Sequence, residues 1–317
     1  MADRIVLLAR RFGRGSGTAG VAWHLARGLR DRGLVVEIWC DERTERLPGV
    51  TLHSGVGRAP RSGLRIGLDR QPDCDVLRCS GGIHERWRAV LRADPRRFFR
   101  GIGPSRTSSA EARAVATATR LVCNAQHVAD DVMARHEVPA ARVRVVRNGV
   151  DLVRFRPDPD RRMAVRRDLG VPPSGRLALF VAHGWFRKGF DAAVHGFLKV
   201  AGPHDRFGVM GRDSRSRRRL SRARSLLGER LVVAEGTDAA SLLPGGDVLV
   251  HPTRYDASAN VVHQAMACGV PPVTTLQDGA AEIIEDRRLI VANPDDDNAV
   301  AASIGHAWEA PGLGARC

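Results

Sequence analysis

The sequence has one tyrosine and two lysines, and aromatic residues make up only 5% of its 317 residues. Proteins that bind nucleic acids commonly combine basic residues with stacking aromatic side chains, or carry a helix-turn-helix or zinc-finger motif. The sequence shows none of these features, so we expect no nucleic-acid partner although the formal net charge is +15. The basic excess is almost entirely arginine. It predicts contact with phosphate on a substrate or with an anionic membrane surface.

Cysteine pairs at metal-binding spacing are also missing. The six cysteines are scattered without a C-x-x-C pair, so the sequence favours neither a zinc site nor a disulfide framework: they are Cys40, Cys74, Cys79, Cys123, Cys268 and Cys317. No apolar run approaches the roughly 20 residues of a membrane span, and the run from Ile5 to Ala9 is too short for a signal-peptide core. We therefore expect a cytoplasmic protein.

The first half of the chain alternates apolar strands with helical patterns. A strand is predicted from Arg4 to Ala9, a helix from Val21 to Arg32 and a second strand from Leu34 to Cys40. This order predicts a βαβ unit in a parallel sheet. The glycine-rich turn after the first strand does not fit the dinucleotide fingerprint. Gly17 in this turn is instead a candidate for close approach to a diphosphate or an acceptor.

The second half repeats the same alternation. Strands are predicted over residues 177–182, 207–210, 231–234, 247–250 and 272–275, with helices beginning at Asp191 and Asn260. The sequence therefore predicts two doubly wound, Rossmann-like α/β domains that face each other across a cleft. A polar, proline-containing stretch from Pro157 to Asp160 places the expected boundary between residues 1–156 and 157–317.

The segment from His251 to Glu282 carries the most informative pattern. An apolar strand is followed by a polar loop, a short helix, a second strand and a glycine-rich turn. Ser258 and Asn260 are candidate N-caps of the helix, and Gly269 with two following prolines ends it. The first amides of such a helix point at the strand end, where they can hold an anion.

This segment resembles the donor-binding region of the retaining, GT-B-fold glycosyltransferases of family 4. In that family a carboxylate meets the transferred sugar, and a glutamate eight residues later holds the ribose of the nucleotide; here Asp256 and Gln264 occupy these positions. The segment from Leu121 to Pro157 resembles the same family. The resemblance implies a first domain on the acceptor side and a second domain that binds a nucleotide sugar.

The resemblance also implies a cationic site for the donor's diphosphate. The predicted strand that ends at Ala182 is followed by Arg187, Lys188 and Gly189, and the family uses the lysine of such a Lys-Gly pair with a nearby arginine. The usual family arginine is replaced here by His183. We expect Arg187 to take over its role, which is an arrangement typical of the lipopolysaccharide-core branch.

Further site residues follow from the same resemblance. His84, after a predicted strand and two glycines, is expected to face the cleft and bond the sugar or the acceptor. Asn260 and Val261 begin the anion-binding helix, Glu282 ends a Gly-Ala-Ala-Glu turn beside the sugar, and Glu235 lies where relatives hold the base.

The predicted function is transfer of a hexose from a nucleotide sugar, with UDP-glucose as the first donor to test, to a cell-envelope glycan or glycolipid. Neither a cofactor nor a metal is expected, because Arg187, Lys188 and helix amides neutralise the leaving phosphate. Asp73 and Asp75 spell the D-x-D pattern of metal-dependent transferases. They precede a predicted strand rather than follow it, so we interpret them as part of the strand entry.

Two alternatives concern partners and activity. The stretch from Arg86 to Arg100 mixes arginine with Trp87, Phe98 and Phe99, which favours peripheral docking on the inner face of the cytoplasmic membrane. The stretch from Arg212 to Arg224 has few apolar residues, so we expect a solvated helix face. The replacements at Asp256 and Gln264, with the short C-terminal segment, leave open a catalytically impaired sugar-nucleotide-binding or scaffold protein.

Overall fold

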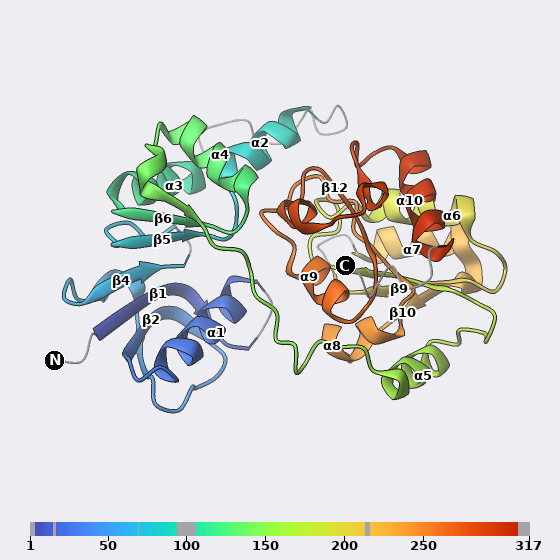
Figure 1. Cartoon of the computed structure of the whole chain (residues 1–317), viewed down its shortest axis with the longest axis horizontal. Coiled ribbons are helices and arrows are strands. Elements are labelled where there is room, and N and C mark those ends of the chain that lie inside the picture. Colours follow the sequence, from blue (N-terminus) through green and yellow to red (C-terminus); the bar gives the residue numbers. More distant parts are fainter. Residues whose placement is uncertain (1–3, 15–16, 69, 94–105, 213–215, 310–317) are drawn as a thin grey trace. The chain divides into compact units, whose positions relative to one another are not determined.

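The structure is a computed structural model that describes residues 4–14, 17–68, 70–93, 106–212 and 216–309. The chain divides into two compact units, Met1–Arg147 and Asn148–Cys317. The expected boundary after residue 156 falls nine residues (156 − 147) further along, just before the first helix of the second unit. Each unit is an α/β domain built on its own sheet (Figure 1).

The first unit contains a parallel sheet of seven strands within its described residues, in the order β3-β2-β1-β4-β5-β6-β7. The predicted strands over residues 4–9 and 34–40 are present and extend to Phe12 and Arg43, whereas β3 and β4 are short strands with no long apolar run to mark them. The strands are β1 Arg4–Phe12, β2 Val35–Arg43, β3 Thr51–Ser54, β4 Leu64–Gly67, β5 Val76–Cys79, β6 Arg120–Cys123 and β7 Val143–Val145.

The helices of the first unit are α1 Thr18–Arg30, α2 His84–Ala93, α3 Arg106–Thr117 and α4 Gln126–His136. Figure 1 shows α1 along β1 and β2, and α3 and α4 near β5 and β6. Helix α1 begins three residues before the expected start, because Gly17 takes a φ of 74° as its N-cap. This φ is readily adopted by glycine alone, so Gly17 fixes where the helix begins.

The second unit contains a parallel sheet of six strands within its described residues, in the order β10-β9-β8-β11-β12-β13. Strand β12 has the predicted bounds, and the other predicted strands differ from the observed ones by one residue at an end. The two-residue strand β13 is too short for its pattern to predict. The strands are β8 Leu177–Val181, β9 Arg206–Met210, β10 Leu231–Val233, β11 Val248–Val250, β12 Pro272–Thr275 and β13 Ile290–Val291.

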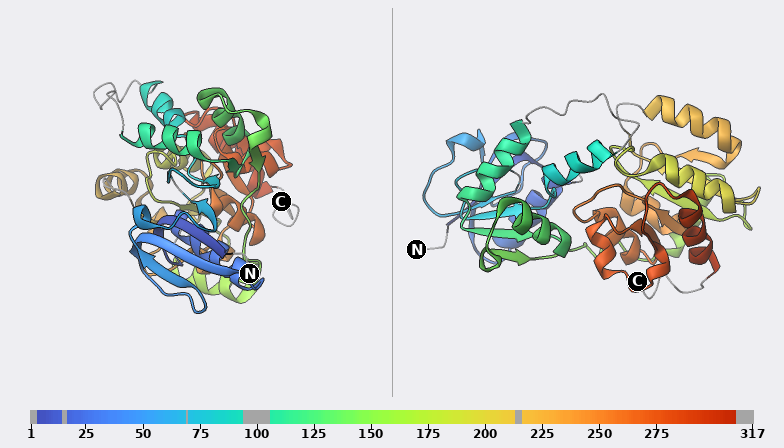
Figure 2. Two further views of the ribbon diagram at one scale, coloured as in Figure 1. Left: turned by 90° about the vertical axis from the view of Figure 1, so that its left-hand side faces the viewer. Right: turned by 90° about the horizontal axis from the view of Figure 1, so that it is seen from above.

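The helices of the second unit are α5 Pro159–Asp168, α6 Phe190–Val200, α7 Ser216–Leu227, α8 Ala239–Leu242, α9 Asn260–Ala267 and α10 Asp297–Glu309. Helix α6 lies between α7 and α10 (Figure 2). The α6–α10 contact includes His195 Nδ1, 3.2 Å from Asp297 Oδ2. Exposed arginines line α7, as expected for a solvated helix face, although residues 213–215 of that stretch lie outside the described residues.

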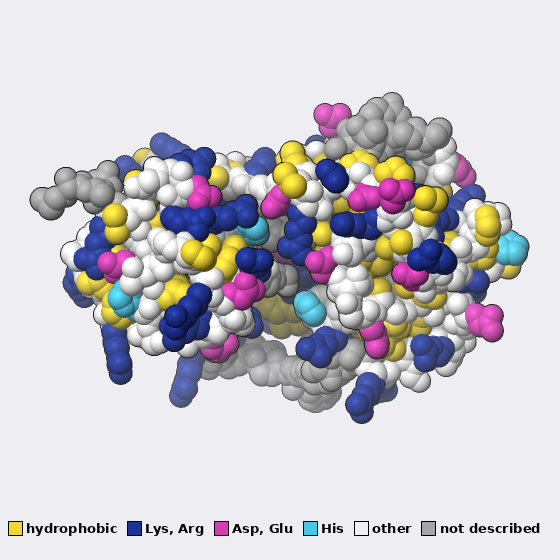
Figure 3. Space-filling model, turned by 90° about the horizontal axis from the view of Figure 1, so that it is seen from below, with side chains coloured by type: hydrophobic (Ala, Val, Ile, Leu, Met, Phe, Trp, Pro, Cys, Tyr) yellow, Lys and Arg dark blue, Asp and Glu magenta, His cyan; other side chains and the backbone are white. Residues whose placement is uncertain are grey.

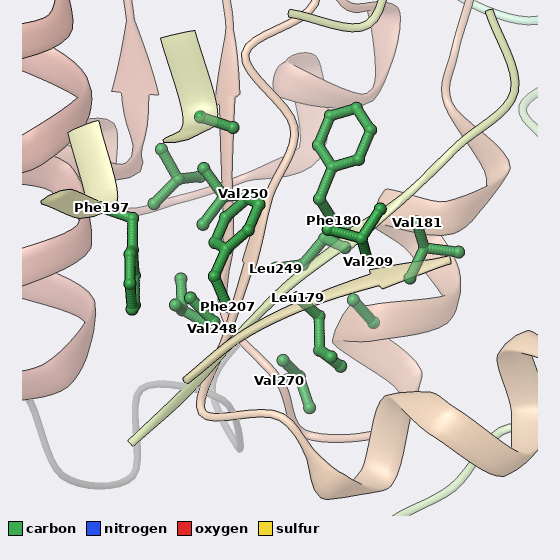
Figure 4. Packing of buried hydrophobic residues seen from close by; sticks show 14 of the residues in the cluster. Leu179, Phe180, Val181, Phe197, Phe207, Val209, Val248, Leu249, Val250 and Val270 are labelled. Atoms are coloured by element: carbon green, nitrogen blue, oxygen red, sulfur yellow. The ribbon is translucent and has the colours of Figure 1, made fainter. Parts of the chain in front are cut away.

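The buried core is mostly aliphatic, but its largest fully buried side chains are aromatic, namely Trp185 and five phenylalanines. In the second unit Trp185 stacks on Phe190 with ring centroids 4.5 Å apart, and Phe197 lies 5.2 Å from Phe207. Figure 4 shows Phe180, Phe197 and Phe207 among aliphatic side chains of the central strands. Each aromatic pair contributes about 0.5–1.5 kcal/mol beyond its buried area.

The strand order of the second sheet determines where a ligand binds. The chain moves outward from β8 through β9 to β10 on one side, then returns to place β11 on the other side of β8. Ligands of open α/β sheets bind beyond the carboxyl ends of the strands at such a reversal. In this unit the reversal lies between β8 and β11.

Candidate functional site

The loops after β8 and β11 meet at this reversal. Strands β8 and β11 are paired neighbours, with Val248 opposite Ala178, so their carboxyl ends lie side by side. The loop after β8 spans residues 182–189, and the loop after β11 spans residues 251–259. The sequence-predicted residues Arg187, Lys188 and Asp256 therefore lie on two adjacent loops.

Trp185 anchors the first of these loops to the core. Its side chain is fully buried, and its indole N–H donates to the Ala182 carbonyl at 2.8 Å. The backbone then turns back, with the Lys188 N–H donating to the Gly184 carbonyl at 3.3 Å. The anchored indole and the tight turn fix where the two following cations emerge.

Gly189 allows the two loops to touch. Its φ is 76°, and a Cβ at this position would overlap the carbonyl oxygen of Pro252. Glycine therefore meets two independent requirements here, a left-handed conformation and direct backbone contact with the neighbouring loop. This contact gives a physical reason for the Lys-Gly pair in the sequence.

Arg187 connects to the second loop through both its side chain and its backbone. Its guanidinium donates to the Tyr255 carbonyl at 3.3 Å. Its own carbonyl accepts from the Arg254 N–H at 2.8 Å and from the Thr253 hydroxyl at 2.9 Å. Burial lowers the pKa of the half-buried Arg187 guanidinium, which still carries its charge at neutral pH.

Lys188 forms an ion pair with Asp256. Both residues are buried, with 9% and 8% of their surface exposed. Burial holds the pKa of the Lys188 amine well below its usual range, Arg187 lowers it further, and the nearby Asp278 carboxylate raises it. Two sequence-predicted residues are thus in direct contact, and each provides the countercharge for the other.

His251 lies next to this pair, and the sequence analysis did not predict it as a site residue. Its side chain is fully buried, and its Nε2 is 3.7 Å from Asp256 Oδ2. Burial holds the pKa of the imidazole well below its usual value, and Lys188 and Arg187 lower it further, so the ring is neutral. Within the described residues, neither ring nitrogen makes a hydrogen bond.

Asp278 is a second residue that sequence reasoning missed. Its carboxylate accepts from the N–H groups of Ala259 and Ala280 at 2.9 and 3.0 Å, and from the Thr274 hydroxyl at 2.9 Å. The backbones of Asp256 and Asp278 also form a β-bridge. The aspartate before a Gly-Ala-Ala turn is a recognisable cap, but its bond to Ala259 joins residues far apart in the chain.

The predicted side-chain caps of α9 are wrong. The N-cap is Ala259, which makes no side-chain bond to the helix. Ser258 Oγ instead lies 2.7 Å from His263 Nε2, and Asn260 Oδ1 accepts from the Asn148 side chain at 2.8 Å. In the described chain the N–H groups of Asn260 and Val261 bond to no protein acceptor, so they remain available to an anion.

The other predicted residues of the second unit lie at the same sheet edge or near it. Val261 and Gln264 are half-buried on α9, and Glu282 is half-buried in the 3₁₀ turn Gly279–Ile283 after β12. Glu235 is exposed after β10, two strands away from β8. The structure thus brings Lys188 and Asp256 into contact and places Glu235 further along the edge.

Gly17 and His84 belong to the first unit, where they follow β1 and β5 at the carboxyl edge of that sheet. The His84 N–H donates to Glu111 Oε2 at 2.8 Å, and this buried carboxylate caps the start of α2. Burial lowers the pKa of the His84 imidazole, and Arg70 lowers it further. A residue that sequence reasoning overlooked, Glu111, therefore sets the position of His84.

The two aspartates of the D-x-D pattern have structural partners. Asp75 Oδ2 accepts from the Arg65 N–H at 2.8 Å, and the Asp73 N–H donates to the Thr117 hydroxyl at 2.9 Å. Both residues precede β5, at the amino edge of the sheet. This is the strand entry that their position in the sequence indicates.

The distribution of surface charge and the character of the helices are relevant to a membrane or another anionic partner. Figure 3 shows lysine and arginine side chains spread over the visible face with acidic residues among them. In the described part of the chain, no helix has the length and apolar character needed to cross a bilayer.

The five cysteines that the structure describes are free and buried, at positions 40, 74, 79, 123 and 268.

Two family models match the chain: "Glycosyl transferases group 1" over residues 175–310 and "Glycosyltransferase Family 4" over residues 76–154. A curated relative, the D-inositol 3-phosphate glycosyltransferase of Acidothermus cellulolyticus, is 29% identical over 226 residues. That match covers 66% of this chain, and the chain spans only 50% of the relative's length.

Solved structures share the fold over nearly the whole chain. WaaG, a glycosyltransferase involved in lipopolysaccharide biosynthesis, superposes with a TM-score of 0.79 at 18% identity, covering 98% of this chain and 91% of WaaG. Anabaena Alr3699/HepE, solved in complex with UDP-glucose, gives a TM-score of 0.73 at 17% identity, covering 96% and 90%. The two parallel-sheet domains therefore have the GT-B fold.

Proposed function

Because the chain carries a glycosyltransferase group 1 domain in its second unit and a family 4 segment that lies mostly in its first, we propose that it transfers a hexose from a nucleotide sugar. UDP-glucose is the proposed donor, and a cell-envelope glycan or glycolipid is the proposed acceptor. The configuration of the sugar is retained in this proposal.

The observation that carries the proposal is the cluster of donors at the β8–β11 reversal. Arg187 and Lys188 supply two positive charges, and the free N–H groups at the start of α9 supply neutral donors on the neighbouring element. A fork of guanidinium donors, an ammonium group and helix amides together match the oxygens of a diphosphate.

The chemistry follows from where negative charge develops. When the bond between the anomeric carbon and the diphosphate breaks, charge grows on the leaving phosphate, and fixed cations stabilise that state more than the ground state. Arg187 and Lys188 serve this role in the proposal, so it requires neither a metal nor a cofactor. Asp256 and Glu282 are then assigned to sugar hydroxyls, and Gln264 to the ribose.

The donor and acceptor are proposed from the chemistry of similar proteins. HepE was solved with UDP-glucose, and WaaG is named for lipopolysaccharide biosynthesis. The curated relative is named for an inositol phosphate, so a phosphorylated polyol is the second acceptor class to test. His84 and Gly17 of the first unit are assigned to the acceptor side.

Helix α2 supports a peripheral membrane contact at the inner face of the cytoplasmic membrane. In the described chain it has no buried side chain, and Trp87, Val90 and Leu91 are only half-buried beside exposed Arg86 and Arg92. Such a helix fits an anionic bilayer surface. Phe98 and Phe99 of the predicted stretch lie outside the described residues. Flotation with anionic vesicles tests this contact, and no binding at low salt would refute it.

A thermal-shift panel of UDP-, GDP- and ADP-sugars tests the donor site. One nucleotide class should raise the melting temperature, and the rise should vanish in Lys188→Ala because the diphosphate loses its ammonium partner. Lys199→Ala is the matched control, since Lys199 is the other lysine and bonds Asn298 on α10. An equal shift in Lys188→Ala and in the wild type would refute the site.

The second candidate is a protein that binds the donor without turnover. The neutral amide of Gln264 favours it, because a glutamate at this position would hold a ribose through a charged hydrogen bond. Donor hydrolysis or transfer by the purified wild type at a measurable rate would exclude this candidate.

A further inference from the structure

The buried pair of Lys188 and Asp256 places an internal anion on the cation that the proposed diphosphate needs. Only 11% and 12% of their side-chain surfaces are exposed. A buried charge that loses its partner is strongly destabilised. Any anion that binds Lys188 therefore competes with Asp256.

The two members of the pair differ in their freedom to move. The Asp256 N–H donates to the Gln277 carbonyl at 2.9 Å, and its carbonyl accepts from the Gly279 N–H at 3.2 Å. The backbone of Asp256 is thus held on both sides, and its short side chain gives the carboxylate little reach. Lysine carries its amine on a flexible four-carbon stem, so the ammonium group can exchange one oxygen partner for another.

We infer that Asp256 is a specificity-determining residue that favours a complete nucleotide sugar over the bare nucleoside diphosphate. This inference rests on the proposed function and adds to it a preference for the nucleotide sugar over the nucleoside diphosphate. A bare diphosphate draws Lys188 away and leaves the Asp256 carboxylate buried without a countercharge. A nucleotide sugar draws Lys188 away too, but its sugar hydroxyls donate to the released carboxylate.

The groups around Asp256 increase the difference in affinity between the bare diphosphate and the nucleotide sugar. Lys188 and His251 lie against the carboxylate, Arg187 donates to the carbonyl of the neighbouring Tyr255, and the Asp278 carboxylate lies near Lys188. Once Lys188 moves, the neutral His251 ring, 3.7 Å away, offers at most one N–H and no charge. A ligand without a hydroxyl donor binds such a site more weakly, because the buried acceptor then has no hydrogen-bond partner.

The expected consequence is weak inhibition by the leaving product. The nucleoside diphosphate formed by transfer has no sugar, so Asp256 recaptures Lys188 and the product is released. The Lys188–Asp256 pair therefore lowers the affinity for the product relative to the affinity for the substrate.

Isothermal titration with UDP and with UDP-glucose, without acceptor, tests the inference. In the wild type UDP should bind at least about tenfold more weakly than UDP-glucose. In Asp256→Asn, which frees Lys188 without removing the side chain, UDP should bind about tenfold more tightly than in the wild type. The two ligands should then differ little.

Two variants separate this effect from a general change of charge. Asp256→Glu keeps the carboxylate on a longer arm and should restore weak UDP binding. Glu285→Gln removes an exposed carboxylate elsewhere in the second unit and should leave both affinities unchanged.

The outcomes distinguish the two proposals. If no nucleoside diphosphate binds, or Lys188→Ala binds it like the wild type, the proposed function fails. If Lys188→Ala abolishes UDP binding but Asp256→Asn binds UDP no more tightly, only the present inference fails. Equal affinity of the wild type for UDP and UDP-glucose overturns the inference without any variant, so poor folding of Asp256→Asn does not protect it.

Discussion

Gly189 illustrates how one residue can meet both a conformational and a steric demand. Alanine in a left-handed conformation costs about 1–2 kcal/mol, and the overlap with Pro252 adds a displacement of the neighbouring loop. We expect Gly189→Ala to lower the free energy of unfolding by about 3 kcal/mol or more, measured by urea titration.

The control for this substitution lies in the same loop. Gly184 has a φ of 71°, but a Cβ there would meet nothing within 4 Å. Gly184→Ala should therefore cost only about 1–2 kcal/mol. Equal losses in the two variants would show that the Pro252 contact has no energetic weight.

His251 makes stability depend on pH. Its pKa is depressed in the folded state, so below the ordinary value of 6.5 the unfolded chain binds a proton that the folded chain does not. Stability from this residue is present above pH 6.5 and is lost as the pH falls, with a slope of up to about 1.4 kcal/mol per pH unit.

Urea unfolding of His251→Asn between about pH 5 and pH 7 should show a shallower loss of stability than the wild type. His183→Gln is the control, because it also removes a histidine, but one that is exposed in the folded protein. An unchanged slope in His251→Asn would mean that other groups cause the acid sensitivity.

At the scale of elements, Asp278 holds three pieces of backbone together. Its carboxylate joins the start of α9, the 3₁₀ turn after β12 and Thr274 of β12. Asp278→Ala leaves two buried N–H groups without an acceptor, so we expect a loss of about 2–5 kcal/mol in the free energy of unfolding. Amide hydrogen exchange at residues 259 and 280 should accelerate as well.

An ordinary helix cap provides the comparison. Asp158 caps α5 by accepting from the Arg161 N–H at 2.9 Å near the surface. Asp158→Ala should cost about 1 kcal/mol. If Asp278→Ala costs no more than this, Asp278 is a local cap and not a link between elements.

The predictability of the elements follows from their hydrophobic patterns. Buried parallel strands such as β8 and β11 are continuous apolar runs, so their bounds were predicted to within a residue. Strands β3 and β4 are partly exposed and short, and their register comes from pairing with β2 and β1. No local pattern in the sequence can supply that pairing.

The site residues divide in the same way. The sequence places Arg187, Lys188 and Asp256 after strands, and parallel topology then brings those strand ends together. His251 and Asp278 were missed because their roles depend on burial and on bonds between distant segments. The caps assigned to Ser258 and Asn260 were wrong because both side chains bond to other side chains, those of His263 and Asn148.

At the scale of the whole molecule, the two units have separate sheets and separate cores. The proposed nucleotide contacts come entirely from the second unit. We expect UDP alone to slow amide exchange in residues 182–189, 251–264 and 276–283 and to leave β1 and β2 unchanged. Exchange mass spectrometry measures this directly, and protection centred on the first unit would contradict the assignment of the donor site.

The loop between Trp185 and Gly189 has a consequence for how such a protein diversifies. Both of its ends are fixed, one by an indole in the core and the other by a backbone contact, so we expect an insertion or deletion between them to displace Arg187 and Lys188. Length variation among related sequences is expected instead in exposed loops at the same sheet edge, such as the one that begins at Glu235 after β10.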